Sequence, residues 1–166
     1  MRRNFLFLLL AAISAGCATA PRSHFSPTAN SFPAAALITQ RGVLTVLGRQ
    51  FTLNGYLARS ATNGQRLIVT ENFGTVLADV LIKPDGEALV MRSGGAFKPK
   101  WIHDYLAADV GCIFGGAPEA SCPGSQLSPT HFVIKRRWYK LEVQIVAVKP
   151  GPQPAEMFDA TRAAKP

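Results

Sequence analysis

Recognisable catalytic motifs are the first thing that this sequence lacks. It has three histidines, His24, His103 and His131, and none has a nucleophile at the spacing of a known catalytic motif. The glycine pairs at 94–95 and 115–116 lack the strand-to-helix lysine context of a phosphate-binding loop. We therefore expect a protein without enzymatic activity and without a cofactor.

Cysteine is scarce as well, with three residues in the chain. No histidine or further cysteine lies at zinc-ligand spacing from Cys112 or Cys122. A metal site is therefore not expected either.

Long hydrophobic runs are confined to the N-terminus. Arg2 and Arg3 precede an apolar stretch, Phe5 to Ile13, that has the length of a signal-peptide core and is too short to span a bilayer. The residues that close it, Ser14-Ala15-Gly16-Cys17, resemble the lipobox of bacterial lipoproteins, whose cysteine is acylated. The resemblance implies a lipid on Cys17 and anchoring in a membrane through it. Ordinary secretion with cleavage elsewhere is the alternative.

The same resemblance implies a cellular location and a division of the chain. Because position 18 is not aspartate, it implies the outer membrane of a Gram-negative bacterium, on the periplasmic face. Residues 1–16 would be the signal peptide, 17–33 a flexible tether, 34–150 the folded domain and 151–166 a tail. Cleavage would leave 150 of the 166 residues and lower the formal charge from +8 to +6, which fits one domain.

With Cys17 assigned to lipid, Cys112 and Cys122 remain as a pair in a compartment that oxidises thiols. The segment between them, IFGGAPEAS, contains turn-forming residues that let the chain fold back. We therefore predict a disulfide, which would close a loop of about 11 residues and stabilise the fold by roughly 3 kcal/mol.

Strand signals dominate the region from Gly42 to Arg92. Alternation of apolar and polar residues, or turns at both ends, predicts strands over 51–58, 65–72, 75–83 and 87–92. Asn63-Gly64 suits a tight hairpin between the first two, and Pro84-Asp85-Gly86 suits a turn between the last two. The pattern predicts a meander of antiparallel strands.

Pro99 to Phe114 has the periodicity of a helix instead. At 100° per residue its large apolar side chains fall in one broad arc, while Lys100 and His103 lie outside it. Such an arc needs an apolar surface, and the concave side of the meander is the candidate. The sequence therefore predicts an α+β fold in which one amphipathic helix covers an antiparallel sheet.

The rest of the chain predicts one further hairpin. Residues 130–149 alternate on both sides of a turn near Lys135-Arg136-Arg137, and the prolines that follow end the second strand. By composition, residues 115–128 form a loop. Residues 34–41 fit either a short helix or an entering strand.

Cations and aromatic residues are interleaved in the segment KRRWYK, residues 135–140. This mixture suits nucleic acid, but a protein behind a lipoprotein signal does not normally meet it, so no nucleic-acid partner is expected. The mixture also suits anionic lipid head groups, with Lys135, Arg136, Arg137 and Trp138 at the membrane interface. A solvated hairpin tip whose aromatic residues pack underneath is the alternative.

Asp109 lies inside the apolar arc of the predicted helix. A buried carboxylate needs a partner or a proton. We expect a structural pair with an arginine from a strand, such as Arg92 or Arg66. Contact with a ligand in a cavity is the alternative.

Four segments carry a resemblance to a known family: FTLNGYLARS, ENFGTVLADVLIKPDG, PKWIHDYLAADVGCIFG and WYKLEVQIV. In this order behind a lipobox they resemble the periplasmic lipoprotein-localisation factors of the LolA/LolB type, which are open half-barrels that hold acyl chains under helices. They resemble even more closely a family of small lipoproteins encoded beside fatty-acid-like synthases for aryl polyene pigments. The outer-membrane acceptor of the LolA/LolB type inserts an apolar loop residue into the bilayer, whereas the loop SATNGQR here is polar apart from alanine.

The resemblance implies an antiparallel sheet curved into an open half-barrel, covered by the helix Pro99 to Phe114. It implies binding or transfer of an acyl-bearing molecule (a lipid, a lipoprotein or an aryl-polyene-type compound), with a periplasmic carrier or export protein as partner. The cargo would be held by burial of apolar area alone. A structural or assembly lipoprotein that recruits a protein partner is the alternative. The predicted cavity residues are Phe51, Leu53, Leu57, Leu67, Val69, Val76, Val80, Trp101, Tyr105, Leu106 and Ile113.

Overall fold

The computed structural model describes residues 32–95, 97–115 and 122–161. The predicted signal peptide, the lipid attachment site Cys17 and nearly all of the predicted tether lie outside these residues.

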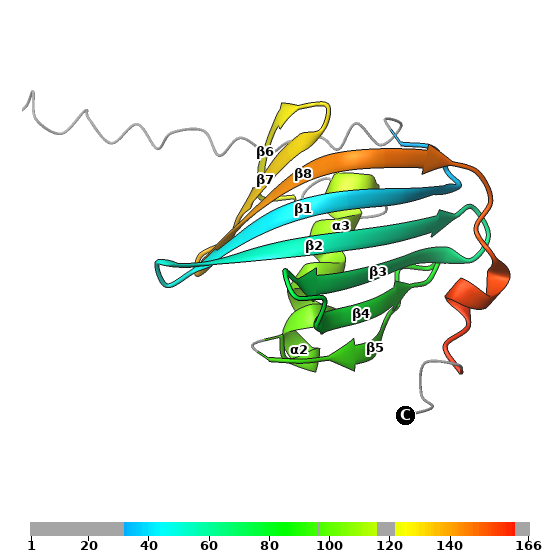
Figure 1. The fold of residues 1–166 in the computed structure, drawn as a ribbon, viewed down its shortest axis with the longest axis horizontal. Coiled ribbons are helices and arrows are strands. Elements are labelled where there is room, and N and C mark those ends of the chain that lie inside the picture. The colour runs from blue at the N-terminus through cyan, green and yellow to red at the C-terminus, as the bar shows by residue number, and fades with distance from the viewer. Residues whose placement is uncertain (1–31, 96, 116–121, 162–166) are drawn as a thin grey trace, which may run out of the picture.

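The described residues form one curved, open sheet of eight antiparallel strands in the order β5-β4-β3-β2-β1-β8-β7-β6 (Figure 1). The predicted α+β architecture with an antiparallel sheet is confirmed. The strands are β1 Ala36–Val46, β2 Arg49–Ser60, β3 Gly64–Glu71, β4 Val76–Ile82, β5 Ala88–Ser93, β6 Gly124–Ser128, β7 His131–Lys135 and β8 Tyr139–Pro150.

The sheet contains two strands that the sequence did not identify. Strand β1, which lies at the centre, includes residues 36–41 of the segment that fitted either a helix or a strand, which decides for the strand, and it pairs with β2 and β8 along its whole length. Strand β6 lies within the segment 115–128 that was predicted to be loop, and that prediction is wrong for residues 124–128. Its glycine, serine and glutamine carry no strand signal, and its strand geometry comes from pairing with β7.

The predicted helix is present between Pro99 and Phe114. It consists of α2 Pro99–Trp101, a π-helical segment η1 Ile102–Leu106 and α3 Ala107–Phe114. Proline fits the first turn because its missing N–H would be unpaired there. The helix ends at Gly115, whose φ of 90° is strained for other residues.

The helix lies against one face of the sheet, which we call the inner face. In β2, Leu53 and Leu57 point to this face, whereas Tyr56 points to the other, outer face. The main hydrophobic core lies between the inner face and the helix, where Ile102 and Val110 are at most 4% exposed.

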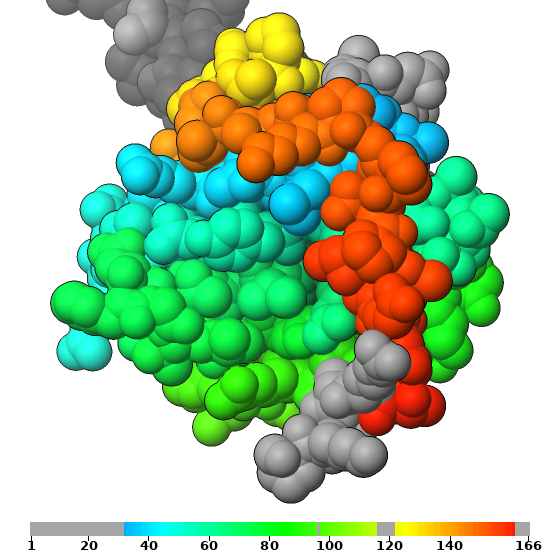
Figure 2. All heavy atoms as spheres, turned by 45° about the vertical axis from the view of Figure 1, so that its right-hand side comes forward, coloured from blue at the N-terminus to red at the C-terminus, as the bar shows by residue number. Residues whose placement is uncertain are grey.

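The C-terminal segment crosses the outer face of the sheet (Figure 2). Its 3₁₀ helix η3, Ala155–Phe158, places Phe158 against Ala58 and Leu81. Arg66 on β3 donates hydrogen bonds to Asp79 and to the backbone oxygen of Met157, at 2.7 Å for the latter. The outer face is therefore partly covered by the chain's own C-terminal segment.

The predicted disulfide joins Cys112 and Cys122. It connects the last turn of α3 to the residues that lead into β6. Both cysteines are completely buried in the main core, so the bridge fixes the C-terminal end of the helix to the sheet.

Candidate functional site: an apolar cleft at one end of the sheet

Two cavities of very different size lie on the inner face. The first is a void of about 40 Å³ between the helix and the middle of the sheet. The second is an open cleft of about 900 Å³ at the end of the sheet that carries the β1–β2 turn and the β3–β4 loop. Pockets for organic ligands usually measure about 300–1,000 Å³, so the cleft has the size of a ligand site and the void does not.

The cleft exists because β2 extends beyond its neighbour β3. Strand β3 ends at Glu71, which pairs with Leu53, and the chain then turns away. The first four residues of β2, Arg49–Thr52, therefore have no β3 partner and stay exposed. The inner side of this overhang forms one wall of the cleft.

Apolar and aromatic side chains make up most of the cleft wall. Five aromatic residues and five aliphatic residues from β1, β2, β4, the helix and the connecting segments contribute, and polar residues and one glycine complete the lining. The lining consists of Phe51, Phe73, Phe97, Trp101, Trp138, Leu44, Val46, Leu47, Leu53, Leu77, Arg49, Gln50, Thr52, Glu71, Asn72 and Gly95.

A wall of side chains separates the cleft from the small inner void. Leu44, Leu53, Phe97 and Trp101 line both spaces. The Phe97 and Trp101 rings pack edge to face with centroids 4.9 Å apart, and Trp101 also meets the ring of Trp138. The indole Nε1 of Trp101 is buried without a hydrogen-bond partner in the described part of the chain.

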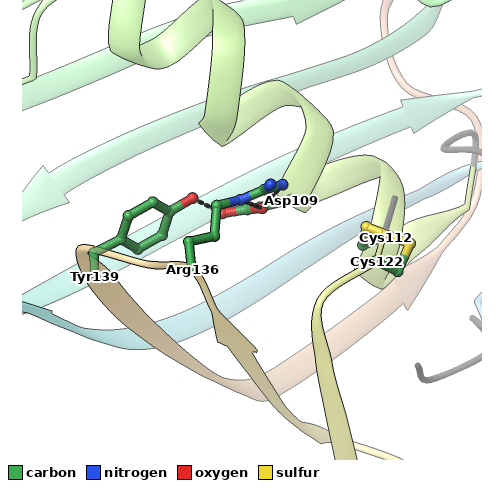
Figure 3. Close-up of polar contacts among 5 residues, drawn as sticks. All are labelled: Asp109, Cys112, Cys122, Arg136 and Tyr139. Atoms are coloured by element: carbon green, nitrogen blue, oxygen red, sulfur yellow. Dashed lines mark hydrogen bonds and ion pairs between the residues drawn. A yellow bond between two sulfur atoms is a disulfide. The ribbon is translucent and has the colours of Figure 1, made fainter. Parts of the chain in front are cut away.

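A buried ion pair anchors the helix beside this wall (Figure 3). Arg136, in the β7–β8 turn, donates from Nε and Nη2 to Asp109 Oδ1 at 3.0 and 2.7 Å. Tyr139 donates its hydroxyl hydrogen to Asp109 Oδ2. Asp109 is 1% exposed, so the helix is attached to the β7–β8 hairpin through a fully buried carboxylate.

Burial has the largest effect on the pKa of the Asp109 carboxyl group. It raises the pKa of Asp109 above its ordinary value, although Tyr139 and Arg136 both act in the opposite direction. Burial and the neighbouring Asp109 carboxylate also raise the pKa of Tyr139, which keeps its hydroxyl protonated as a donor.

The predicted structural pair of Asp109 with an arginine is confirmed, but the arginine is Arg136 in the β7–β8 turn and neither of the two named from the strands. Arg66 pairs with Asp79 on the neighbouring strand instead, and Arg92 lies exposed on β5. The helical periodicity places Asp109 on the buried side of the helix, but it does not show which part of the sheet faces that side.

The predicted cavity residues divide into three groups. Phe51, Leu53 and Trp101 line the cleft. Leu67, Val69, Leu106 and Ile113 line the inner void, which packing has almost closed. The remaining four, Leu57, Val76, Val80 and Tyr105, line neither space.

The four residues predicted for head-group contact also separate. Lys135 and Arg137 are exposed at the hairpin tip, and Trp138 lines the cleft. Arg136 is not a free surface cation, because its guanidinium is held by Asp109.

Sequence reasoning missed the two most exposed apolar residues of the cleft. Leu47, at the β1–β2 turn, is 89% exposed, and Phe73, in the β3–β4 loop, is 95% exposed. Leu47 has a φ of 49°, in the left-handed region that leucine rarely adopts. The polar loop SATNGQR connects β2 to β3 at the opposite end of the strands, so its polarity does not describe the cleft.

No protein-family model matches this chain, and a search of curated proteins also finds no match. Within residues 32–95, 97–115 and 122–161, no helix has the length and hydrophobicity to cross a bilayer. The same residues contain no cluster of three or more side chains that could hold a metal ion.

The Asp109–Arg136 pair generates a stability prediction. Replacing Arg136→Met leaves a buried carboxylate without its cation, which we expect to lower the free energy of unfolding at pH 7 by about 3 kcal/mol. Arg137→Met removes the same charge from an exposed neighbour and should change it by less than about 0.5 kcal/mol. Urea unfolding of the three proteins measures both values.

The loss of stability caused by Arg136→Met should depend on pH, and it should be smaller at low pH than at neutral pH. Burial raises the pKa of Asp109, so the folded variant binds a proton more tightly than the unfolded chain does. The contribution of Asp109 to the stability of the variant is therefore most favourable below the ordinary aspartate pKa and is lost as the pH rises. A difference from the native chain that is equal at pH 4 and pH 7 would contradict this account of the pair.

Proposed function

We propose that this protein binds an acyl-bearing or similar long apolar molecule in the cleft, without catalysis. The observation that carries the proposal is an open, aromatic-lined cleft of about 900 Å³ on the inner face of a curved sheet, beside the helix that covers it. An open sheet with a helix on its inner face also fits the half-barrel of the LolA/LolB type that the sequence resembles.

Burial of apolar area is sufficient to hold such a ligand. Each buried methylene contributes about 0.8 kcal/mol, so sixteen would give about 13 kcal/mol, before an entropic cost of binding of at least about 4 kcal/mol. A net 8.2 kcal/mol would correspond to a dissociation constant of about 1 μM. A chain of this kind would therefore bind reversibly and could be passed on.

The mouth of the cleft suits contact with a lipid surface. Leu47 and Phe73 project from two different turns that border the same cleft. Trp138 lies in the cleft wall beside the exposed Arg137, and aromatic residues next to cations are typical of membrane interfaces. We propose that the mouth contacts the bilayer when cargo is exchanged.

Anchoring completes this proposal. A lipid on Cys17 would hold the protein at the periplasmic face of the outer membrane, within reach of a bilayer and of a periplasmic carrier or export protein. The cargo would be a lipid, a lipoprotein acyl group or an aryl-polyene-type compound.

A structural or assembly role remains the second candidate. The sheet is open, so β5 and β6 are edge strands. Leu127 on β6 is 60% exposed, and an exposed apolar residue on an edge strand favours a protein contact.

Native mass spectrometry tests ligand binding directly. The protein, purified gently from its own host, should carry co-purifying acyl species that lipid extraction releases. Phe51→Asp introduces a charge into the cleft and should remove most of them, whereas Tyr56→Asp should retain them. The two residues lie on opposite faces of β2 and are 43% and 44% exposed, which makes them matched sites. An apo mass for the native chain that persists after adding fatty acid would contradict the proposal.

Vesicle experiments test the proposed mouth. The double substitution Leu47→Ser and Phe73→Ser should reduce binding to vesicles, or transfer of a fluorescent fatty acid to them, by about tenfold, because two apolar side chains no longer enter the bilayer. Leu127→Ser with Val146→Ser removes apolar side chains that are 60% and 56% exposed elsewhere. Equal losses in the two double variants would exclude a specific mouth.

A further inference from the structure

Arg49 is the only cation that lines the cleft among the described residues. It is the first residue of β2 and pairs with Val46 across the two-residue turn Leu47-Gly48. Alternation along β2 places its side chain on the inner face with Phe51 and Leu53. A guanidinium therefore stands at the mouth of a largely apolar cleft.

The side chain of Arg49 makes no hydrogen bond or ion pair within the part of the chain that the structure describes. Several other cations are paired with an acid, as Arg66 is with Asp79 and Arg136 with Asp109. Glu71 is the acid that lines the cleft, and it lies beyond ion-pair distance of Arg49. The charge of Arg49 is therefore available to a ligand.

We infer that the ligand of the cleft is an anionic amphiphile, whose carboxylate or phosphate is bound by Arg49 while its apolar chain extends inward. The inference rests on the proposed function and adds the chemistry of the head group. Guanidinium binds both anions with two parallel hydrogen bonds. At the mouth the head group remains in contact with water, so binding requires no burial of charge, and the chain extends toward Leu53 and Trp101.

Glu71 provides a second test of the inference, because its charge should affect the affinity for the ligand in the opposite direction. Its carboxylate lies in the same cleft and repels an anionic head group. Removing the charge of Arg49 should weaken binding of an anionic ligand, and removing the charge of Glu71 should strengthen it slightly.

The test compares a fluorescent fatty acid, cis-parinaric acid, with its methyl ester. We expect the native chain to bind the acid about tenfold more tightly than the ester, in line with a charge-assisted hydrogen bond. The Arg49→Gln variant should lose this preference, because its affinity for the acid falls while its affinity for the ester stays the same. Arg41→Gln removes the same charge from an exposed site on the outer face of β1 and should retain the preference. Glu71→Gln should increase it.

The outcomes separate the inference from the proposed function. If the native chain binds neither probe, both are wrong. If it binds acid and ester equally, or if Arg49→Gln keeps the preference, the head-group assignment alone is wrong. Equal effects of Arg49→Gln and Arg41→Gln would also overturn the head-group assignment, because the overall positive charge of the protein and not a specific site would then explain the preference.

Competition experiments identify the anion. If dodecanoate displaces the probe more effectively than dodecyl phosphate does, the head group is assigned as a carboxylate. If dodecyl phosphate is the more effective competitor, it is assigned as a phosphate. If neither competes better than dodecanol, Arg49 does not bind an anionic head group.

Discussion

Packing of the helix Pro99–Phe114 against the inner face determines where the core of this protein is closed and where the cleft stays open. The helix covers the middle of the sheet so closely that only a void of about 40 Å³ remains beneath it. It does not cover the end where β2 extends beyond β3, and there a cleft of about 900 Å³ stays open. The site is therefore defined by the ends of two elements: where the helix begins and where β3 stops.

Three different contacts keep the helix in this position. The disulfide holds its C-terminal end, the buried pair of Asp109 with Arg136 holds its middle, and edge-to-face contacts of Trp101 with Phe97 and Trp138 hold its beginning. The first two are strong and specific, whereas the aromatic contacts are apolar and also form the wall of the cleft. A ligand in the cleft would thus meet the aromatic contacts at the beginning of the helix.

Much of the architecture could be predicted from local pattern, because period-two alternation, turn residues and helical periodicity are local signals. Strands β2 to β5, the β7–β8 hairpin and the helix belong to this group, whereas the disulfide was predicted from the count of cysteines and the expected compartment. Strand β6 and the partner of Asp109 depend on which distant segment lies alongside, and residue order does not record that. The cleft was missed in part for the same reason: Leu47, Arg49 and Phe73 belong to turns or strand ends that only the folded sheet brings together.

An apolar chain bound in the cleft would lie against both tryptophans of the protein. The chain contains two tryptophans, and both Trp101 and Trp138 line the cleft. The most direct measurement is a titration of the intrinsic tryptophan fluorescence with a dibrominated fatty acid, whose bromines quench an indole at contact. We predict saturable quenching of most of the emission, with displacement by the unbrominated acid. Quenching that rises linearly without saturation, or none at all, would contradict a ligand in the cleft.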